Sequence, residues 1–346
     1  MDHMASSGAG AETVEALMAR GAAFLGSRYA ILGGAMSWVS ERNLVAALSN
    51  AGAFGVIACG AMMPERLAEE IEATKRLTSQ PFGVNLITMH PRLLELVRVS
   101  LDAGVGHIVF AGGIPPGAAI KAAKEGGAKV ICFAPALALA KKLVRSGADA
   151  LVIEGSEAGG HIGPVSLTVL AQEILPYMRD VPVFVAGGIG RGEMLLSYLR
   201  MGAAGAQLGT RFVCAVESIA HPNFKKAFIR GAARDALPTT QLDPEFPVIP
   251  VRALQNAGGR RFIEHQADVI RRFRAGELTK ESAQLDIEHF WAGALRRAVI
   301  DGDVENGSVM AGQSVGLVTR EQPAAEIIEE LLQQARVALM EMQARV

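Results

Sequence analysis

Residues 129–163 read KVICFAPALALAKKLVRSGADALVIEGSEAGGHIG and contain the pattern that decides the fold. A short run rich in β-formers, Lys129–Phe133, is followed by a turn and by the amphipathic segment Leu137–Arg145, and a second apolar run, Ala150–Ile153, comes next. Runs this short and rich in Val, Ile and Phe predict buried strands, and the periodicity between them predicts a helix. The stretch therefore predicts two parallel strands joined by a helix.

The same unit recurs from about residue 30 to residue 212. The other apolar runs are Ala30–Leu32, Phe54–Ile57, Phe82–Leu86, His107–Phe110, Val181–Val185 and Ala206–Leu208. The other helical segments are Asn43–Asn50, Pro64–Leu77, Pro91–Leu101, Gly117–Glu125, Leu167–Met178 and Glu193–Arg200. A series of eight strands alternating with helices predicts a (β/α)8 TIM barrel, and a doubly wound open sheet is the alternative.

Composition excludes several classes of protein. The 346 residues are 50% apolar and have a formal net charge of -1, so the charge expected of a nucleic-acid binder is missing. No apolar run is long enough for a membrane span, and no export signal is visible, so we expect a cytoplasmic protein. The widely spaced Cys59, Cys132 and Cys214 predict buried, reduced thiols. The histidines lack metal-ligand spacing, so no metal site is expected.

The repeat defines the expected domains. Residues 1–27 form a tail and a leading helix, and residues 28–212 form the barrel. Residues 213–290 are richer in charge and lack the repeat, which indicates a smaller, mainly helical insertion after strand eight. Residues 291–346 comprise a Gly-rich loop and a final helix that packs back on the barrel.

Glycines follow the seventh and eighth strands of the predicted barrel. Ala186–Gly190 reads AGGIG, and Gly209–Arg211 reads GTR. Glycine lets the backbone approach a ligand, and a following helix offers free N–H groups, so both loops favour a phosphate. Phosphate sites after these two strands recur in TIM barrels. The alternative is that the glycines only end the strands.

Two polar side chains stand at other strand ends. His161 lies in the Gly-rich stretch Glu154–Gly163, and imidazole can move protons near neutral pH. An ordinary loop histidine is the alternative. Asn85 follows strand three, where its amide can offer a donor and an acceptor to a heterocyclic ring, although it could simply cap a turn.

These motifs together resemble the flavin mononucleotide (FMN)-dependent 2-nitropropane dioxygenase-like family, which includes nitronate monooxygenases and the flavin-dependent enoyl-acyl-carrier-protein reductase II. The resemblance covers about residues 28–340. GGHIG at Gly159–Gly163, GTRFV from Gly209 and GSVMAGQ at Gly307–Gln313 are most similar to the reductase branch. The first strand departs from the family pattern, because Gly33 replaces a Gln and Ala35 replaces a Gly.

The resemblance implies a TIM barrel that binds FMN, with His161 as the acid/base residue beside it. The residues implied in cofactor binding are Gly34, Met36, Asn85, Glu154, Gly159, Gly187, Gly188, Gln207, Gly209, Thr210 and Gln313. The Trp38 position also matches the family.

The activity implied is that of an NADH- or NADPH-dependent enoyl-thioester reductase of fatty acid biosynthesis, in which a hydride passes through flavin N5 to the substrate. The alternative is a nitronate monooxygenase that uses oxygen, and a non-catalytic flavin barrel or a phosphate-ligand isomerase is more remote. Acyl carrier protein is a possible partner, because Lys225, Lys226, Arg230, Arg260 and Arg261 could form a basic docking face. Solvated surface charges are the alternative. A homodimer is also possible.

Overall fold

A computed structural model describes residues 12–246 and 248–345, and its centre is a ring of eight parallel strands. In spatial order these are β1 (Ile31–Gly33), β9 (Gly205–Leu208), β8 (Val183–Ala186), β6 (Ala150–Glu154), β5 (Lys129–Phe133), β4 (His107–Ala111), β3 (Phe82–Ile87) and β2 (Gly55–Ala58). The ring closes at Phe54, whose N–H donates to Ile31 O (2.8 Å) and whose carbonyl accepts the Gly33 N–H (2.9 Å). The TIM barrel is confirmed, and the open sheet is excluded.

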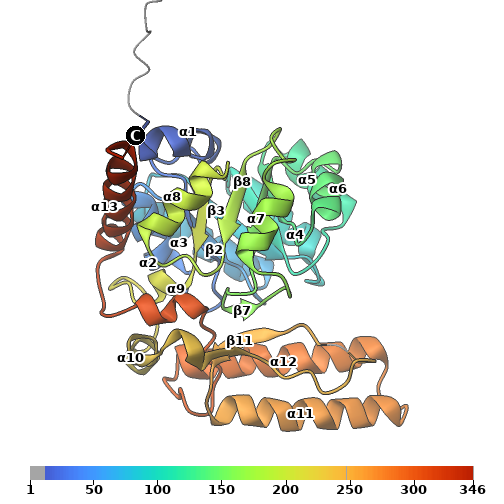
Figure 1. Ribbon diagram of the computed structural model, residues 1–346. Coiled ribbons are helices and arrows are strands. Elements are labelled where there is room, and N and C mark those ends of the chain that lie inside the picture. The colour runs from blue at the N-terminus through green and yellow to red at the C-terminus, as the bar shows by residue number, and fades with distance from the viewer. Residues whose placement is uncertain (1–11, 247, 346) are drawn as a thin grey trace, which may run out of the picture.

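Helices cover the outside of the barrel (Figure 1). They are α2 (Arg42–Asn50), α3 (Pro64–Leu77), α4 (Leu93–Asp102), α5 (Gly117–Glu125), α6 (Leu137–Arg145), α7 (Leu167–Ile174) and α8 (Gly192–Arg200). Each strand of the barrel is almost wholly buried because side chains pack on both of its faces. Helix α7 ends earlier than the periodicity predicted.

The first and last helices complete this part of the molecule. Helix α1 (Val14–Leu25) lies at the amino ends of the strands, where Phe24 O lies 3.0 Å from His107 Nε2. Helix α13 (Ala324–Gln343) packs on α8 at Gly192, where a Cβ would collide with the Leu331 carbonyl. The final helix therefore returns to the barrel as predicted. No helix in the described ranges is both long and apolar enough to cross a membrane.

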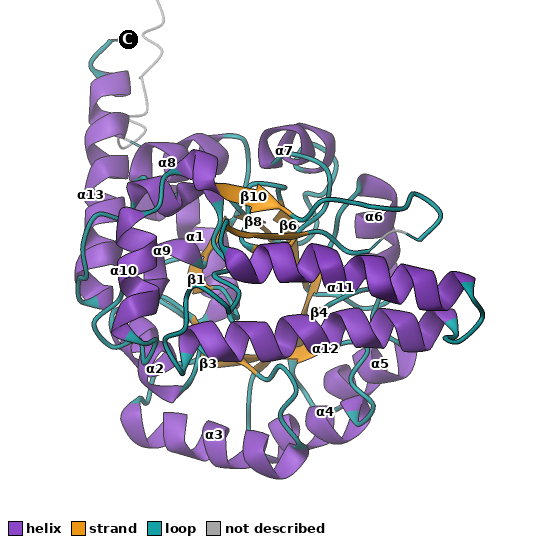
Figure 2. Cartoon of the chain, turned by 90° about the horizontal axis from the view of Figure 1, so that it is seen from below, coloured by secondary structure: helices purple, strands orange, loops and turns teal. Residues whose placement is uncertain are grey.

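A second body of structure, which we call the lobe (residues 236–299), lies below the carboxyl ends of the strands. Two short helices lead to it, α9 (Thr210–Val213) and α10 (Pro222–Arg230). The lobe contains strands β10 (Ala236–Pro238) and β11 (Val251–Leu254) and the long helices α11 (Ala257–Arg274) and α12 (Lys280–Val299). Figure 2 shows α11 and α12 side by side across the mouth of the barrel.

The lobe differs from the prediction in two ways. It is not only helical, because β10, β11 and the two-residue strand β7 (Gly160–His161) form an antiparallel sheet. The boundary expected at residue 290 is wrong, because α12 continues to Val299. Ile287 and Trp291 belong to the apolar core of the lobe, whereas Ala298 and Val299 belong to the core of the barrel. Helix α12 therefore joins the two cores.

Candidate active site

The parallel ring brings the polar residues of the strands to one end of the barrel. Asn85 pairs with Ala58 and Val109 in neighbouring strands, Glu154 pairs with Ala186, and Gln207 pairs with Ala186 and Leu32. Asn85 and Gln207 are buried, and Glu154 is partly exposed. The first turn after β1 joins them, because the Gly34 N–H donates to Leu208 O (2.8 Å). Polar side chains from three separate strands, together with the Gly34 backbone after β1, thus lie at the mouth.

The glycines after β8 and β9 (the cradle), where the sequence predicted a phosphate site, lie at the carboxyl ends of neighbouring strands. Gly187 and Gly188 have φ values of 96° and 70°, and a Cβ on Gly187 would lie 3.0 Å from Gly155 O. In the described part of the chain, the N–H groups of Gly187, Gly188 and Gly209 donate to no protein acceptor. Unpaired N–H groups grouped at a helix-proximal loop are the usual donors to a phosphate.

Thr210 supports this cradle from the side. Its Oγ1 accepts the Gly312 N–H at 3.0 Å, which ties the loop before η2 (Gln313–Leu317) to the end of β9. The Gln313 N–H also donates to Glu157 O (2.9 Å). The loop carrying Gln313 is thus fixed against the ends of β6 and β9. This position is compatible with the cofactor contact that the resemblance implies for Gln313.

Gly159 has a packing reason that the sequence did not reveal. A Cβ there would lie 2.5 Å from the Gly312 N atom and 2.6 Å from the Ala311 C atom. Glycine is therefore required so that the loop before Gln313 can close over the Gly-rich stretch.

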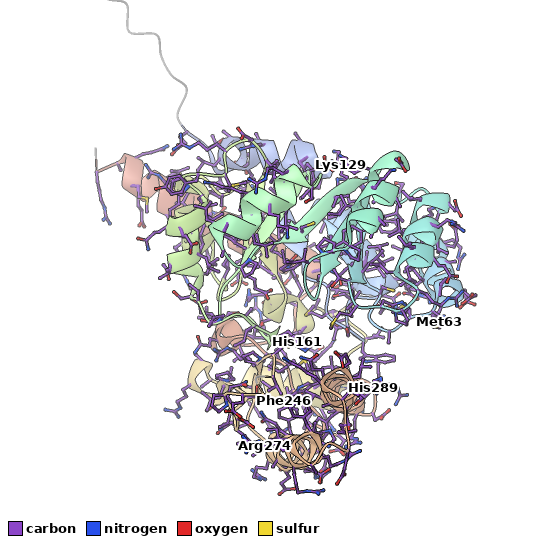
Figure 3. All side chains as sticks on the ribbon, turned by 90° about the vertical axis from the view of Figure 1, so that its right-hand side faces the viewer. Met63, Lys129, His161, Phe246, Arg274 and His289 are labelled. Atoms are coloured by element: carbon purple, nitrogen blue, oxygen red, sulfur yellow. The ribbon has the colours of Figure 1, made fainter. Side chains whose placement is uncertain are left out.

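His161 lies at the junction between the barrel and the lobe (Figure 3). It is exposed and belongs to β7, where it pairs with Val251 of β11. The Ile162 N–H donates to Pro250 O (3.0 Å), and buried Arg252 donates from Nε to Ser156 O (2.9 Å). The lobe therefore holds the histidine loop in place, a role of Arg252 that sequence reasoning missed.

The two carboxylates near His161 have different roles. Burial raises the pKa of Glu154 to about 8, so its carboxyl group is mostly protonated at neutral pH and can donate a hydrogen bond. Glu157 instead accepts the Leu167 N–H at 2.9 Å, at the start of α7. Only Glu154 of this pair is therefore suited to contact a ligand in the mouth.

Asn85 is a strand residue, so the turn-cap alternative is wrong. Its Nδ2 donates to Val109 O at 3.3 Å, which holds the amide and leaves Oδ1 available as an acceptor. Met36 also reaches the cradle, because a Cβ on Gly209 would lie 3.4 Å from its Sδ atom.

The unusual first strand does not remove a group from the site. A side chain at Gly33 would point at Leu48 of α2, outside the ring of strands. Ala35 is partly buried against the barrel core. The Gly33 and Ala35 departures therefore change packing behind the strand rather than the polar lining of the mouth.

The cysteines and two of the basic residues that the sequence singled out have structural surroundings. Among the described residues, no group of His, Cys, Asp or Glu could hold a metal ion. The three cysteines are buried, and burial raises the pKa of each thiol to about 12. Lys225 does not belong to a docking face, because it is buried and its Nζ donates to Ala215 O (2.8 Å) and Glu321 (3.1 Å). Arg260 is paired with Glu305 (3.7 Å).

A TIM barrel with glycine loops after β8 and β9 and a histidine at its mouth is compatible with a flavin-dependent oxidoreductase, and the match to a protein family decides the class. The sequence profile of the nitronate monooxygenase family matches residues 19–99 and 93–334. The chain belongs to this family, and it is a flavin-dependent oxidoreductase of that family.

Three relatives show the range of the family. FabK from Thermotoga maritima, an enoyl-acyl-carrier-protein reductase II, is 35% identical with a TM-score of 0.84, over 94% of this chain and 99% of that one. The (3aS,4S,5R,7aS)-5-hydroxy-7a-methyl-1-oxo-octahydro-1H-indene-4-carboxyl-CoA dehydrogenase of Mycobacterium tuberculosis is 30% identical over 89% of this chain and 93% of its own. A probable nitronate monooxygenase of Staphylococcus saprophyticus is 27% identical, over 92% and 98%.

Proposed function

We propose that the protein is an NAD(P)H-dependent, FMN-containing reductase of enoyl thioesters. The observation that carries the proposal is the likeness to FabK over 94% of the chain, together with a histidine loop that the lobe fixes at the mouth. FabK and the mycobacterial CoA dehydrogenase are both named for thioester chemistry, which supports a thioester as the shared substrate class.

The residues of the mouth fit an FMN group. The N–H groups of Gly187, Gly188, Gly209 and Thr210 would hold the phosphate, and Asn85, Glu154, Gln207 and Gln313 would meet the ring, as would Gly34 and Met36. Once bound, FMN supplies hydride transfer between NAD(P)H and the substrate β-carbon.

The protein itself binds, orients and protonates the substrate. His161 holds a hydrogen bond to the thioester carbonyl or delivers a proton to the α-carbon as the enolate forms. Protonated Glu154 donates a hydrogen bond inside the mouth, and Arg252 keeps the His161 loop in place through Ser156.

Nitronate monooxygenase activity is the second candidate, because the family profile and the staphylococcal relative carry that name. In that reaction His161 would remove the acidic proton next to the nitro group. Both reactions require an acid/base group at the same place, so the histidine does not separate them.

Anaerobic mixing followed by flavin absorbance separates the two. We expect NADH or NADPH to bleach the flavin and an enoyl thioester to restore its colour. Bleaching by a nitronate but not by either nicotinamide would support the monooxygenase and overturn the reductase. Enoyl-CoA and enoyl-acyl-carrier-protein should be compared at low salt, because exposed Lys226 and Arg230 remain as candidate contacts for an acidic carrier.

A further inference from the structure

Trp38 has an unusual backbone for a large side chain. Its φ is 69°, and within residues 12–246 and 248–345 it is the one non-glycine residue with a positive φ. A bulky residue rarely adopts this conformation unless its surroundings impose it, and such outliers gather at functional sites. Trp38 lies four residues after Gly34, at the carboxyl end of β1.

The turn that imposes this conformation is rigid. Ser40 Oγ donates to Gly34 O (2.8 Å) and accepts the Met36 N–H (3.0 Å), and the Ser40 N–H donates to Met36 O (2.8 Å). The Ala58 N–H then donates to Ser40 O (3.0 Å), which ties the turn to β2. The turn therefore fixes the backbone on either side of Trp38, whose side chain is exposed.

The ring meets helix α12 of the lobe. The Arg296 guanidinium carbon lies 5.8 Å from the centre of the Trp38 ring, within the range of a cation–π contact. Arg296 is also oriented by Asp301, whose two oxygens lie 3.2 and 3.1 Å from Nη1. Because both residues are exposed, the contact is weak enough to open when a ligand competes for the ring.

Trp38 begins a series of exposed apolar side chains on one side of the mouth. Trp38, Met63, Met89 and Ile114 follow β1, β2, β3 and β4, and their exposed fractions are 45%, 46%, 62% and 55%. Met63 lies at the edge of the barrel that faces the lobe (Figure 3). On the other side, β7 and the loop before Gln313 cover the mouth. Exposed apolar side chains therefore line the rim of the mouth after β1 to β4.

We propose that Trp38 is a specificity-determining residue that limits the size of the acyl group entering between this apolar rim and α12. Held by Arg296, the ring admits short, unbranched enoyl groups and excludes bulky ones. This inference rests on the proposed thioester reductase. It assigns the residue that selects among thioesters, and it assigns no role in hydride or proton transfer.

Selectivity for acyl size tests the proposal. Trp38→Gly removes the ring and tolerates the positive φ, whereas Trp38→Phe keeps a ring. We expect Trp38→Gly to raise the ratio of kcat/KM for a dodecenoyl thioester to that for a crotonyl thioester by about tenfold or more, mainly through KM. Arg296→Gln should act in the same direction, and Arg297→Gln and Trp38→Phe should not. An unchanged ratio in a folded, flavin-loaded Trp38→Gly variant would overturn the proposal.

Fluorescence tests the contact without catalysis. The chain has two tryptophans, and Trp291 is buried in the lobe, so a Trp291→Phe background reports on Trp38 alone. In this background we expect Arg296→Gln to increase acrylamide quenching of Trp38, and Arg297→Gln to leave it unchanged. Equal quenching in both variants would overturn the contact. If quenching responds but no enoyl thioester is turned over, the proposed function fails and the contact stands.

Discussion

The barrel and the lobe differ in the size of their apolar cores and in the polar groups that lack hydrogen-bond partners. The barrel core is large and continuous, and its unpaired polar groups among the described residues include backbone N–H groups on the glycine loops and Nε of buried Arg211. The lobe core is small, and it buries polar side chains that find no partner among the described residues: both amide atoms of Gln266 and the indole N–H of Trp291. Buried polar groups without partners cost stability.

This difference suits the two parts to different tasks, which are to fix ligand-binding groups in the barrel and to adjust around a substrate in the lobe. The rigid barrel fixes the positions of the N–H groups that we propose as phosphate donors, because parallel strands hold the loops after β8 and β9 in place. The lobe supplies the pairing that holds His161 and the helix that faces Trp38, and its imperfect core makes it the part better able to adjust around a substrate.

Removal of the His161 imidazole should have the largest effect. His161→Ala is expected to lower turnover by about 10²–10⁴-fold while the flavin stays bound, since general acid/base catalysis contributes that much. Steady-state kinetics and the flavin spectrum measure both quantities. His161→Gln keeps hydrogen bonding but cannot transfer a proton, so it separates the two roles proposed for the residue. Wild-type turnover in His161→Ala would remove the residue from the mechanism.

A methyl group in the phosphate cradle should have the next largest effect. Gly187→Ala places a Cβ 3.0 Å from Gly155 O at a φ of 96°, so we expect FMN affinity to fall by about tenfold or more. Gly202→Ala is the matched control, because its φ is 103° and a Cβ there meets nothing within 4 Å. Fluorescence titration of the apoprotein gives both dissociation constants. Equal losses of affinity would show that backbone strain, not the cradle, is responsible.

The buried amide of the lobe should have a smaller effect. Gln266→Leu removes unpaired polar atoms from a fully buried position, so it should stabilise the lobe by about 1–2 kcal/mol. Hydrogen exchange of α11 measures this directly. Gln172→Leu, at an exposed position, should change nothing. Destabilisation by Gln266→Leu would mean that the amide has a partner in solution.

Glu154 should give a pH dependence of stability. Its pKa rises from 4.5 to about 8 in the folded protein, so its contribution is fully present below pH 4.5 and is lost as the pH rises toward 8. Relative to Glu154→Gln, the wild-type apoprotein should therefore lose a few degrees of melting temperature, roughly, between pH 5 and 8. A difference that does not change with pH would contradict a desolvated, protonated carboxyl group.

Much of the barrel could be predicted from the sequence because its signals are local. The runs Phe82–Leu86 and Lys129–Phe133 are apolar and short, and the turns after them contain Gly or Pro. The positions of the strands, and the location of the site loops at their carboxyl ends, therefore follow directly from the sequence. The glycines after the seventh and eighth strands were found for the same reason.

The lobe could not be predicted equally well because its contacts are distant in sequence. Strand β7 has two residues, and its partner Val251 lies 90 positions away, so no periodicity reveals it. Charge likewise does not show burial: Lys225 looks like a surface residue, but the inner face of α10 buries it. The positive φ of Trp38 arises from the hydrogen bonds of Ser40, which no motif encodes.

The most direct test of the central claim compares FMN with riboflavin in the wild-type apoprotein. The two ligands share a ring and differ in the phosphate, so the ratio of their dissociation constants isolates the cradle after β8 and β9. We predict that FMN binds at least about 100-fold more tightly, because several N–H groups donate to the charged phosphate. Equal affinities for the two ligands would contradict the account.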